Sequence, residues 1–231
     1  MTTSVIYTAI CGEKDRLLDI RRKLDTTKAV AFVDDLLNPI YQNRGWELRK
    51  AVRFSDDPGY SDRRNAKIHK ILPHLFFPEA EYSLWVDATH FPADYLQVII
   101  DNNLQTNDIA CFDHPLRNCL YDEGQEILRI NRETGRGDHA FLVEAQMKYY
   151  EKLNYGKNLG LVSNTVILRR HTEQITKLNL AWWEQICKFS SRDQLSFMFV
   201  ANKLGIQVGI MPGDWLKNDS IPCRQRHLKE L

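Results

Sequence analysis

A single carboxylate closes one short apolar run of the chain, and it is the first candidate for chemistry. The run reads Glu81-Tyr-Ser-Leu-Trp-Val and ends at Asp87. Such runs, bounded by polar residues, are typical of buried strands in a parallel sheet, where both faces are covered. Asp87 is therefore expected at the carboxyl edge of a sheet, where open α/β proteins bind ligands. We interpret Asp87 as the centre of a site.

The residues after Asp87 bear on whether this site holds a metal ion. Two carboxylates in an Asp-x-Asp pattern would offer Mg²⁺ or Mn²⁺ the hard oxygen ligands that these ions prefer, and the ion could bridge two phosphates of a nucleotide. Thr89 stands where the second acid would be. His90 could complete the ligand set, although a histidine near a strand end is more often a structural residue. Both interpretations of the metal stay open.

A stripe of basic residues precedes Asp87. A helix is predicted from Asp62 to His74, because apolar residues recur on one face at Ile68, Ile71, Leu72 and Leu75. The adjacent stripe consists of Arg63, Lys67, Lys70 and His74. Four potential cations without an interleaved acid could bind a diphosphate. The alternative is an ordinary solvated face of the helix, which is what a run of charges usually means.

Two other acids follow predicted strands. Lys28–Val33 is a β-prone run that ends at Asp34, which could bond to a base or ribose or could simply cap a turn. The run 108–112 delivers a loop that contains Asp113, His114 and Arg117. Loops raised on a rigid sheet commonly carry function, whereas the alternative is an Asx-type turn followed by a capped helix.

Asp193 has a local explanation. Ser191 and Gln194 fit a capping box at the start of a predicted helix, and an acid in the first turn interacts favourably with the helix dipole. These patterns account for Asp193 without a ligand. A role for Asp193 in a site has to be argued from elsewhere.

The elements that must position these residues alternate between strand and helix. Strands are expected at 5–10, 28–33, 46–53, 81–86, 108–112, 160–169 and 206–211, and helices at 13–24, 62–74, 96–104, 123–132, 140–153, 172–189 and from 190. Strand and helix units in succession favour a mainly parallel sheet with right-handed crossovers. The fold class predicted is α/β, with the sheet flanked by helices.

Composition sets the outer bounds. The 231 residues suit one α/β domain with a substantial core, and 43% hydrophobic and 26% charged residues are ordinary globular values. A net charge of +1 gives no electrostatic reason to expect nucleic acid or an anionic membrane as a partner. Any anionic ligand must be held by a local cluster of cations.

Cysteine usage and the terminus bear on location. The 5 cysteines are widely spaced and include no CxxC pair, which argues against a disulfide framework and a thiolate zinc site. The N-terminus has no basic region followed by an apolar segment, and no apolar run approaches the ~18 residues of a membrane span. We expect a cytoplasmic protein without a membrane span, although a segment cut from a longer protein would look the same.

Several of these features together resemble one protein family. They are Thr8-Ala9 with Cys11-Gly12, Asp34, Arg64-x-x-Lys67-x-x-Lys70-x-x-Pro73-His74, Leu84-Trp-Val-Asp87, His114-Pro-x-Arg117-x-Cys119-x-Tyr121-x-Glu123, Leu168-Arg-Arg-His171 and Arg192-Asp-Gln-Leu-Ser-Phe197. Over nearly the whole chain, the sequence resembles a glycosyltransferase-like family formerly catalogued as a domain of unknown function. Its plant members include probable hexosyltransferases linked to seed mucilage, and one member is described as an alkaline ceramidase.

The resemblance implies a GT-A-like, Rossmann-type fold in a single domain. Residues 1–113 would form the nucleotide-sugar half, and residues 114–231 would form the acceptor half and a C-terminal tail. Asp87 would hold a manganese or magnesium ion, with His227 as a second ligand from the tail. The residues expected to bind the nucleotide diphosphate sugar are Thr8, Asp34, Arg64, Lys67, Lys70, His114 and Arg117.

The mechanism implied is transfer of a hexosyl or similar group from a nucleotide diphosphate sugar to an acceptor hydroxyl. Negative charge grows on the leaving diphosphate, so Arg64, Lys67, Lys70 and any ion at Asp87 would stabilise it. An inverting enzyme also needs a base near the acceptor, for which Asp193 is the first candidate and Asp113 the second. A retaining enzyme could lack that base, so stereochemistry stays open.

Two alternatives from other classes remain. A ceramidase-like hydrolase would need a nucleophile with its base or a metal cluster, and no HExxH or GxSxG pattern supports one. A non-catalytic nucleotide-sugar-binding module is suggested by Thr89. The acceptor could be a glycan, a lipid, a small molecule or a modified nucleobase, and the donor sugar and oligomeric state are not predicted.

Overall fold

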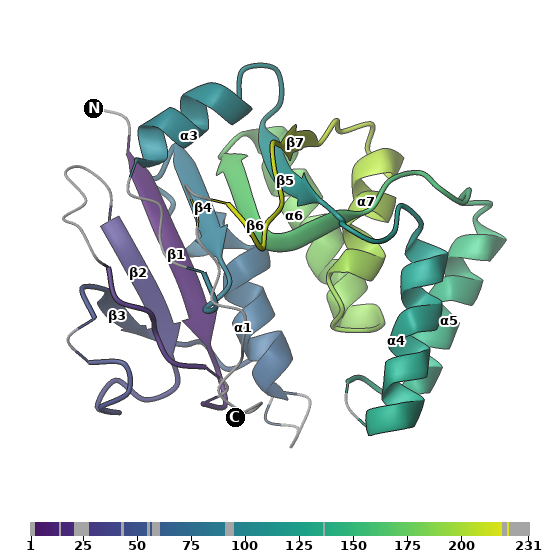
Figure 1. Cartoon of the computed structure of the whole chain (residues 1–231), viewed down its shortest axis with the longest axis horizontal. Coiled ribbons are helices and arrows are strands. Elements are labelled where there is room, and N and C mark those ends of the chain that lie inside the picture. Colours follow the sequence, from purple (N-terminus) through teal and green to yellow (C-terminus); the bar gives the residue numbers. More distant parts are fainter. Residues whose placement is uncertain are drawn as a thin grey trace.

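A seven-stranded sheet forms the centre of the protein (Figure 1). The computed structural model describes residues 3–13, 15–20, 28–42, 44–54, 56, 61–90, 95–135, 137–218 and 221. Its strands are β1 Ser4–Ile10, β2 Lys28–Val33, β3 Glu47–Lys50, β4 Tyr82–Val86, β5 Ile109–Asp113, β6 Val162–Arg170 and β7 Gly209–Met211. Their order across the sheet is β3-β2-β1-β4-β6-β5-β7.

Most of this sheet is parallel. β1 pairs in parallel with β2 on one side and β4 on the other, and β3 extends this set beyond β2. β6 runs antiparallel to both β4 and β5, and β7 pairs in parallel with β5. The carboxyl ends of β1, β2 and β4 therefore meet at one edge, as the sequence predicted for Asp87.

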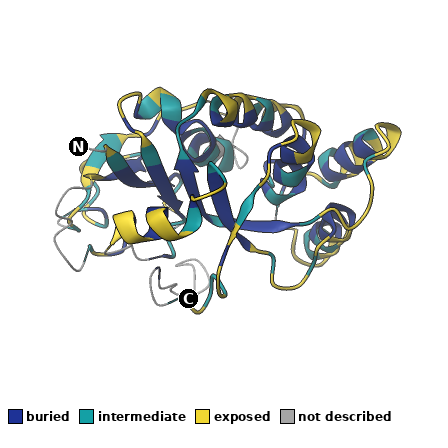
Figure 2. Cartoon of the chain, turned by 90° about the horizontal axis from the view of Figure 1, so that it is seen from above, coloured by how far each residue is buried: buried dark blue, intermediate teal, exposed yellow. Residues whose placement is uncertain are grey.

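Helices cover both faces of the sheet. They are α1 Ser61–Ile71, α2 Pro73–Phe76, α3 Leu96–Asn103, α4 Leu120–Thr134, α5 Ala140–Lys152, α6 Glu173–Lys188 and α7 Gln194–Lys203. One core cluster joins residues of α1 and α4 to α7 with one face of the strands, and a second joins α3 with the other face. Figure 2 shows the buried strands between these helices. The predicted α/β fold, a mostly parallel sheet flanked by helices, is confirmed.

The strands alternate their side chains between the two clusters. On β4, Leu84 and Val86 enter the cluster beneath α3, whereas Trp85 faces the cluster of α1 and α6. Every one of these side chains is 3% exposed or less, so the run is buried on both faces as a parallel strand should be.

One predicted helix is wrong over the residues that can be compared. The segment 13–24 was expected to be helical, but residues 15–20 form no helix, and residues 14 and 21–24 lie outside the described part. The backbone groups here pair with another segment: Ile20 N–H donates to Arg44 O, and Trp46 Nε1 donates to Leu18 O. These bonds across the fold replace the bonds within a helix.

Pro73 divides the predicted helix 62–74 into two. α1 ends at Ile71, and Pro73 starts the single turn of α2, because proline lacks an N–H and is tolerated at the start of a helix. Four cysteines of the described residues, Cys11, Cys111, Cys119 and Cys187, form no disulfide bond, and Cys223 lies outside these residues. Across the described ranges, no helix has the length and apolar character needed to cross a membrane.

Candidate active site

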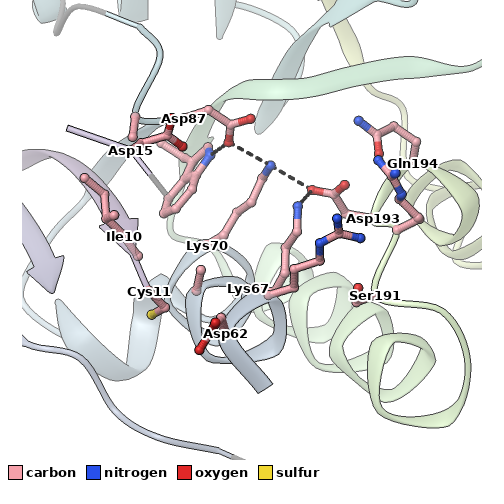
Figure 3. A pocket seen from close by; sticks show the side chains of 16 residues that line it. Ile10, Cys11, Asp15, Asp62, Lys67, Lys70, Asp87, Ser191, Asp193 and Gln194 are labelled. Atoms are coloured by element: carbon pink, nitrogen blue, oxygen red, sulfur yellow. Dashed lines mark hydrogen bonds and ion pairs between the residues drawn. The ribbon is translucent and has the colours of Figure 1, made fainter. Parts of the chain in front are cut away.

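A cavity of about 540 Å³ opens at the carboxyl edge of the sheet. Its walls come from the ends of β1 and β4, from one side of α1 and from the segment that enters α7. Figure 3 shows Lys67, Lys70 and Asp193 pointing toward one another, with Asp87 at the end of the same chain of contacts. The cavity lies where the topology of an open α/β sheet predicts a ligand.

Asp87 is held firmly at the end of β4. Its backbone N–H donates to Thr165 O over 2.8 Å, and its backbone carbonyl accepts from His90 N–H over 2.9 Å. Its Oδ1 atom accepts from Trp85 Nε1 at 2.7 Å and from Lys70 Nζ at 3.1 Å. The side chain remains 34% exposed. Asp87 thus lines the cavity with one carboxylate oxygen engaged by the protein.

Asp193 joins the two lysines of α1. Its Oδ2 atom lies 2.5 Å from Lys67 Nζ and 2.7 Å from Lys70 Nζ. The side chains of Lys70 and Asp193 are only 1% and 3% exposed, whereas Lys67 is 21% exposed. Lys70 therefore bridges two acids, Asp87 and Asp193, from beneath the cavity, and Lys67 is the ammonium group nearer to solvent.

These contacts decide the charge states. Burial would raise the pKa of Asp193, but the ammonium groups of Lys67 and Lys70 hold that pKa well below its usual range. Burial lowers the pKa of Lys67 to about 8, even though the carboxylate of Asp193 opposes this shift. Burial also acts to lower the pKa of Lys70, but Asp193 and Asp87 together raise it above its ordinary value. Near neutral pH all three groups are charged.

The basic stripe of α1 faces the cavity, so its interpretation as a solvated face is wrong for most of its members. Arg63, Lys67 and Lys70 line the cavity. His74 does not line it, and it belongs to α2, which Pro73 starts after α1 has ended at Ile71. The helical spacing of four and three residues correctly placed the first three on one side.

The capping-box interpretation of the α7 start is also wrong. Asp193 is the N-cap residue of α7, but its side chain makes no capping hydrogen bond, because it is committed to Lys67 and Lys70. Ser191 Oγ donates to Asp138 Oδ1 at 2.8 Å instead of capping the helix. The local pattern was real, but tertiary contacts took both side chains.

Other predicted site residues lie off the cavity, and two of them, Arg64 and Asp34, have structural partners where the sequence expected a ligand. Arg64 donates from Nη2 to Phe189 O at 2.9 Å and from Nε to Ile186 O at 3.4 Å, and so satisfies carbonyls at the end of α6. Asp34 Oδ2 accepts from Gly12 N–H, as the turn-capping alternative predicts. Thr8 is 1% exposed within β1.

The loop after β5 forms a separate cluster that does not line the cavity. Arg117 Nε lies 2.6 Å from Glu123 Oε2, and His114 Nδ1 accepts from Arg117 N–H at 3.1 Å. Burial lowers the pKa of His114. Asp113 is exposed, and its Oδ1 accepts from His114 N–H at 3.1 Å. These contacts match the alternative of a turn that leads into a helix.

Two acids of the cavity were not predicted. Asp15 and Asp62 both line it, one from the segment after β1 and one from the first turn of α1. Asp15 follows a strand end, which is the signal that identified Asp87, but the expected helix obscured it. Gly12 lies against Asp62: its φ is +71°, and a Cβ there would collide with Asp62 Oδ2, so a larger residue would be both strained and blocked.

The side chains that line the cavity determine whether it could hold a divalent ion. Within the described ranges, no group of three or more His, Cys, Asp and Glu side chains is arranged to hold one. Asp87 Oδ2 accepts no hydrogen bond from these residues, since both of the side chain's bonds go to Oδ1. Mg²⁺ is commonly bound by one or two carboxylates together with substrate phosphates, and Asp87 fits that pattern. His227 lies outside the described residues.

The fold and the cavity define an α/β domain with a cavity at the carboxyl edge of its sheet. Residues 27–214 match the TOD1/MUCI70, glycosyltransferase-like domain family. The chain belongs to this family, and the resemblance inferred from its motifs is confirmed.

Two curated plant relatives are similar over most of the chain. The chain is 29% identical to the "Probable hexosyltransferase MUCI70" of Arabidopsis thaliana over 97% of its length. It is 25% identical to the "Alkaline ceramidase TOD1" of the same plant over 88% of its length. The chain spans only 36% and 49% of these relatives, respectively.

Among solved structures, the apo form of mouse xyloside xylosyltransferase 1 aligns with 91% of this chain and 84% of its own. The TM-score is 0.44 at 10% identity.

Proposed function

We propose that this domain binds a nucleotide diphosphate sugar in the cavity and transfers its sugar to an acceptor hydroxyl. The observation that carries the proposal is the lysine and aspartate group at the carboxyl edge, in which Lys67 and Lys70 meet Asp193 and Asp87 around one cavity. Membership in a glycosyltransferase-like family supplies the reaction class. The size of the cavity, about 540 Å³, is within the usual range for small-molecule sites.

The lysines would act on the leaving group. When the bond from the sugar to the diphosphate breaks, negative charge accumulates on the phosphate oxygens, and fixed cations stabilise it without rearranging. Lys67 is suited to this contact, because its side chain is partly exposed to the cavity. Lys70 is buried beneath it and keeps Asp193 and Asp87 apart at a fixed spacing.

A divalent ion, if used, would be held by Asp87 through Oδ2. When bound, it would supply positive charge to the diphosphate as a Lewis acid. Trp85 and Lys70 already fix the other oxygen of Asp87, so the carboxylate is oriented before any ligand arrives. Manganese or magnesium as the ion, and His227 as a further ligand, stay predictions.

Asp193 is poorly suited to be the catalytic base that the sequence suggested. A carboxylate paired with two ammonium groups has a pKa far below neutrality, so it takes up a proton weakly at working pH. Holding the lysines in place is the role that its contacts support. Asp113, the second candidate, would need an acceptor that reaches outside the cavity.

The acceptor half remains a proposal. We place the nucleotide-sugar half in residues 1–113 and the acceptor half in residues 114–231, and the segment 192–194 brings the second half to the cavity. The acceptor classes and the cytoplasmic location stay predictions from the sequence, and no oligomeric state is predicted.

The similarity to TOD1 raises the hydrolase alternative, but no side-chain arrangement within the described residues favours it. Ser83 Oγ lies 2.8 Å from His171 Nε2, a pairing of the type that a nucleophile and its base make. Ser83 is 0% exposed, so a substrate cannot reach it, and burial lowers the pKa of His171 to about 4. Both residues lie outside the cavity.

Thermal unfolding with a panel of nucleoside diphosphates and nucleotide sugars, with and without manganese, tests the proposal. A ligand at about 100 times its dissociation constant should stabilise the protein by roughly 2.7 kcal/mol. Asp87→Ala should reduce the manganese-dependent part of the shift. Asp101→Ala on α3, which covers the other face of the sheet, is the control and should keep the full shift. The absence of any shift with every ligand in wild type would overturn the proposal.

A further inference from the structure

The segment that carries Asp193 into the cavity is fixed by a residue far from it in the sequence. Asp138 lies in the connection between α4 and α5 and is 1% exposed. Its Oδ2 atom accepts from Ser190 Oγ at 2.8 Å and from Ser191 N–H, and its Oδ1 accepts from Ser191 Oγ at 2.8 Å. Both carboxylate oxygens therefore bond to the loop between α6 and α7.

Ser190 connects Asp138 to the residues that line the cavity. Ser190 Oγ, which donates to Asp138, also accepts from Arg192 N–H at 3.0 Å. Arg192 is the residue before Asp193, and both line the cavity. Asp193 O then accepts from Ser196 N–H and Phe197 N–H in the first turn of α7. The carboxylate of Asp193 thus lies between two backbone anchors, one set by Asp138 and one by the helix.

A buried carboxylate needs strong partners to be retained. Burial would raise the pKa of Asp138, but the hydrogen bonds from Ser190 and Ser191, with the nearby charge of Arg64, lower it. Within the described residues, no cation forms an ion pair with Asp138 at salt-bridge distance, so its charge is balanced mainly by the loop it holds. Arg64 Nη2 donates to Phe189 O, just before Ser190 in the chain. The loop is held from both sides.

We propose that Asp138 is a positioning residue that sets the carboxylate of Asp193 against Lys67 and Lys70. Its backbone is itself fixed, since Asn131 Nδ2 donates to Asp138 O at 3.0 Å. The proposal rests on the proposed function only in taking this cavity as the donor site. Arg64 supports the same loop, and so acts on the cavity without touching a ligand.

Labelling of lysines in the full chain tests this without any donor. N-hydroxysuccinimide acetate reacts with neutral amines, and mass spectrometry gives the rate at Lys67 relative to Lys177, which is 66% exposed. Asp138→Ala should raise the Lys67 rate about tenfold, the effect of weakening one hydrogen bond to a charged group. In Asp138→Ala, the pH at which Lys67 reacts at half its maximal rate should also fall, because an ammonium group that loses a carboxylate gives up its proton more easily.

Two further variants separate positioning from general destabilisation. Asp138→Asn keeps an acceptor oxygen of the same size and should restore a rate near that of wild type. Asp108→Ala is the matched control: Asp108 accepts from Arg170 Nη1 at 2.6 Å and Thr172 Oγ1 at 3.2 Å, and lies off the cavity. It should leave the Lys67 rate unchanged.

The proposal is overturned if folded Asp138→Ala reacts at Lys67 like wild type, or if Asp108→Ala raises that rate equally. If Asp138→Ala does not fold, Ser190→Ala replaces it, because it removes the hydroxyl that links Asp138 to Arg192 N–H. It should give a smaller rise in the same direction, and no rise would count against the proposal. Failure of wild type to bind nucleotides would instead overturn the proposed function and leave the labelling result standing.

Discussion

Two clusters of charged residues, both marked by the sequence as candidates for the site, differ in structure. The lysine and aspartate cluster joins Lys67 and Lys70 to Asp193, 126 and 123 positions further along the chain, around a cavity. The loop cluster joins Arg117 to Glu123, 6 residues away, and does not line the cavity. A cluster that distant segments assemble around a cavity is a candidate site, whereas one that joins a loop to the helix that follows it stabilises that connection.

Burial separates the two clusters as well. Lys70 and Asp193 are 1% and 3% exposed, and an ion pair this deep gives up most of its hydration. Arg117 is 25% exposed and keeps part of its water. Buried charges are expensive to maintain, which makes the first cluster the one more strongly tied to a function.

The largest effect should follow removal of Lys70. Lys70→Met leaves Asp193 buried with one cation instead of two, and breaking a buried ion pair typically costs about 3 kcal/mol or more. Urea unfolding at pH 7 measures the change in free energy of unfolding. Lys177→Met is the control, since its exposed pair with Glu173 should contribute close to nothing. Equal stability of the two variants would remove the energetic distinction between the clusters.

The next effect concerns turnover. Lys67→Met removes an ammonium group proposed to face the leaving diphosphate, and loss of one such group typically lowers kcat about 100-fold or more. The rate is measured as release of nucleoside diphosphate. The donor is the nucleotide sugar that raised the melting temperature of the wild-type protein. Arg129→Met, on the outer face of α4, removes one positive charge outside the cavity and should leave the rate unchanged. A Lys67→Met enzyme of full activity would contradict the proposed role.

A third effect sharpens the comparison through pH. The pKa of Lys67 is lowered to about 8, so its ammonium form is lost as the pH rises through that value. Affinity for a diphosphate should therefore fall about tenfold between pH 7 and pH 9. Calorimetric titration over this range measures it. In Lys67→Arg the guanidinium stays charged, so the fall should vanish; its persistence would assign the titration to another group.

The two clusters show which features of the structure could be predicted from the sequence and which could not. Local periodicity was sufficient for most elements: the apolar run before Asp87 is β4, and the spacing of the α1 cations correctly placed three of them on one side. It could not reveal Asp138, because the bonds of Asp138 to Ser190 and Ser191 span more than 50 residues. It explained Asp193 by a helix start, which accounts for an acid equally well whether or not lysines lie opposite, and only the family resemblance pointed Asp193 to the site.

The smallest effect tests the loop cluster itself. Arg117→Met removes the 2.6 Å contact with Glu123, and at this exposure we expect a loss of about 1 kcal/mol in the free energy of unfolding. Affinity for the nucleoside diphosphate should stay within about twofold of wild type, because Arg117 does not line the cavity.

Arg132→Met on the neighbouring α4 is the matched control for charge, and urea unfolding and calorimetric titration give the two quantities. A large loss of affinity in Arg117→Met alone would place the loop after β5 in the ligand site. The sequence assigned Arg117 to nucleotide-sugar binding, and that result would restore the assignment.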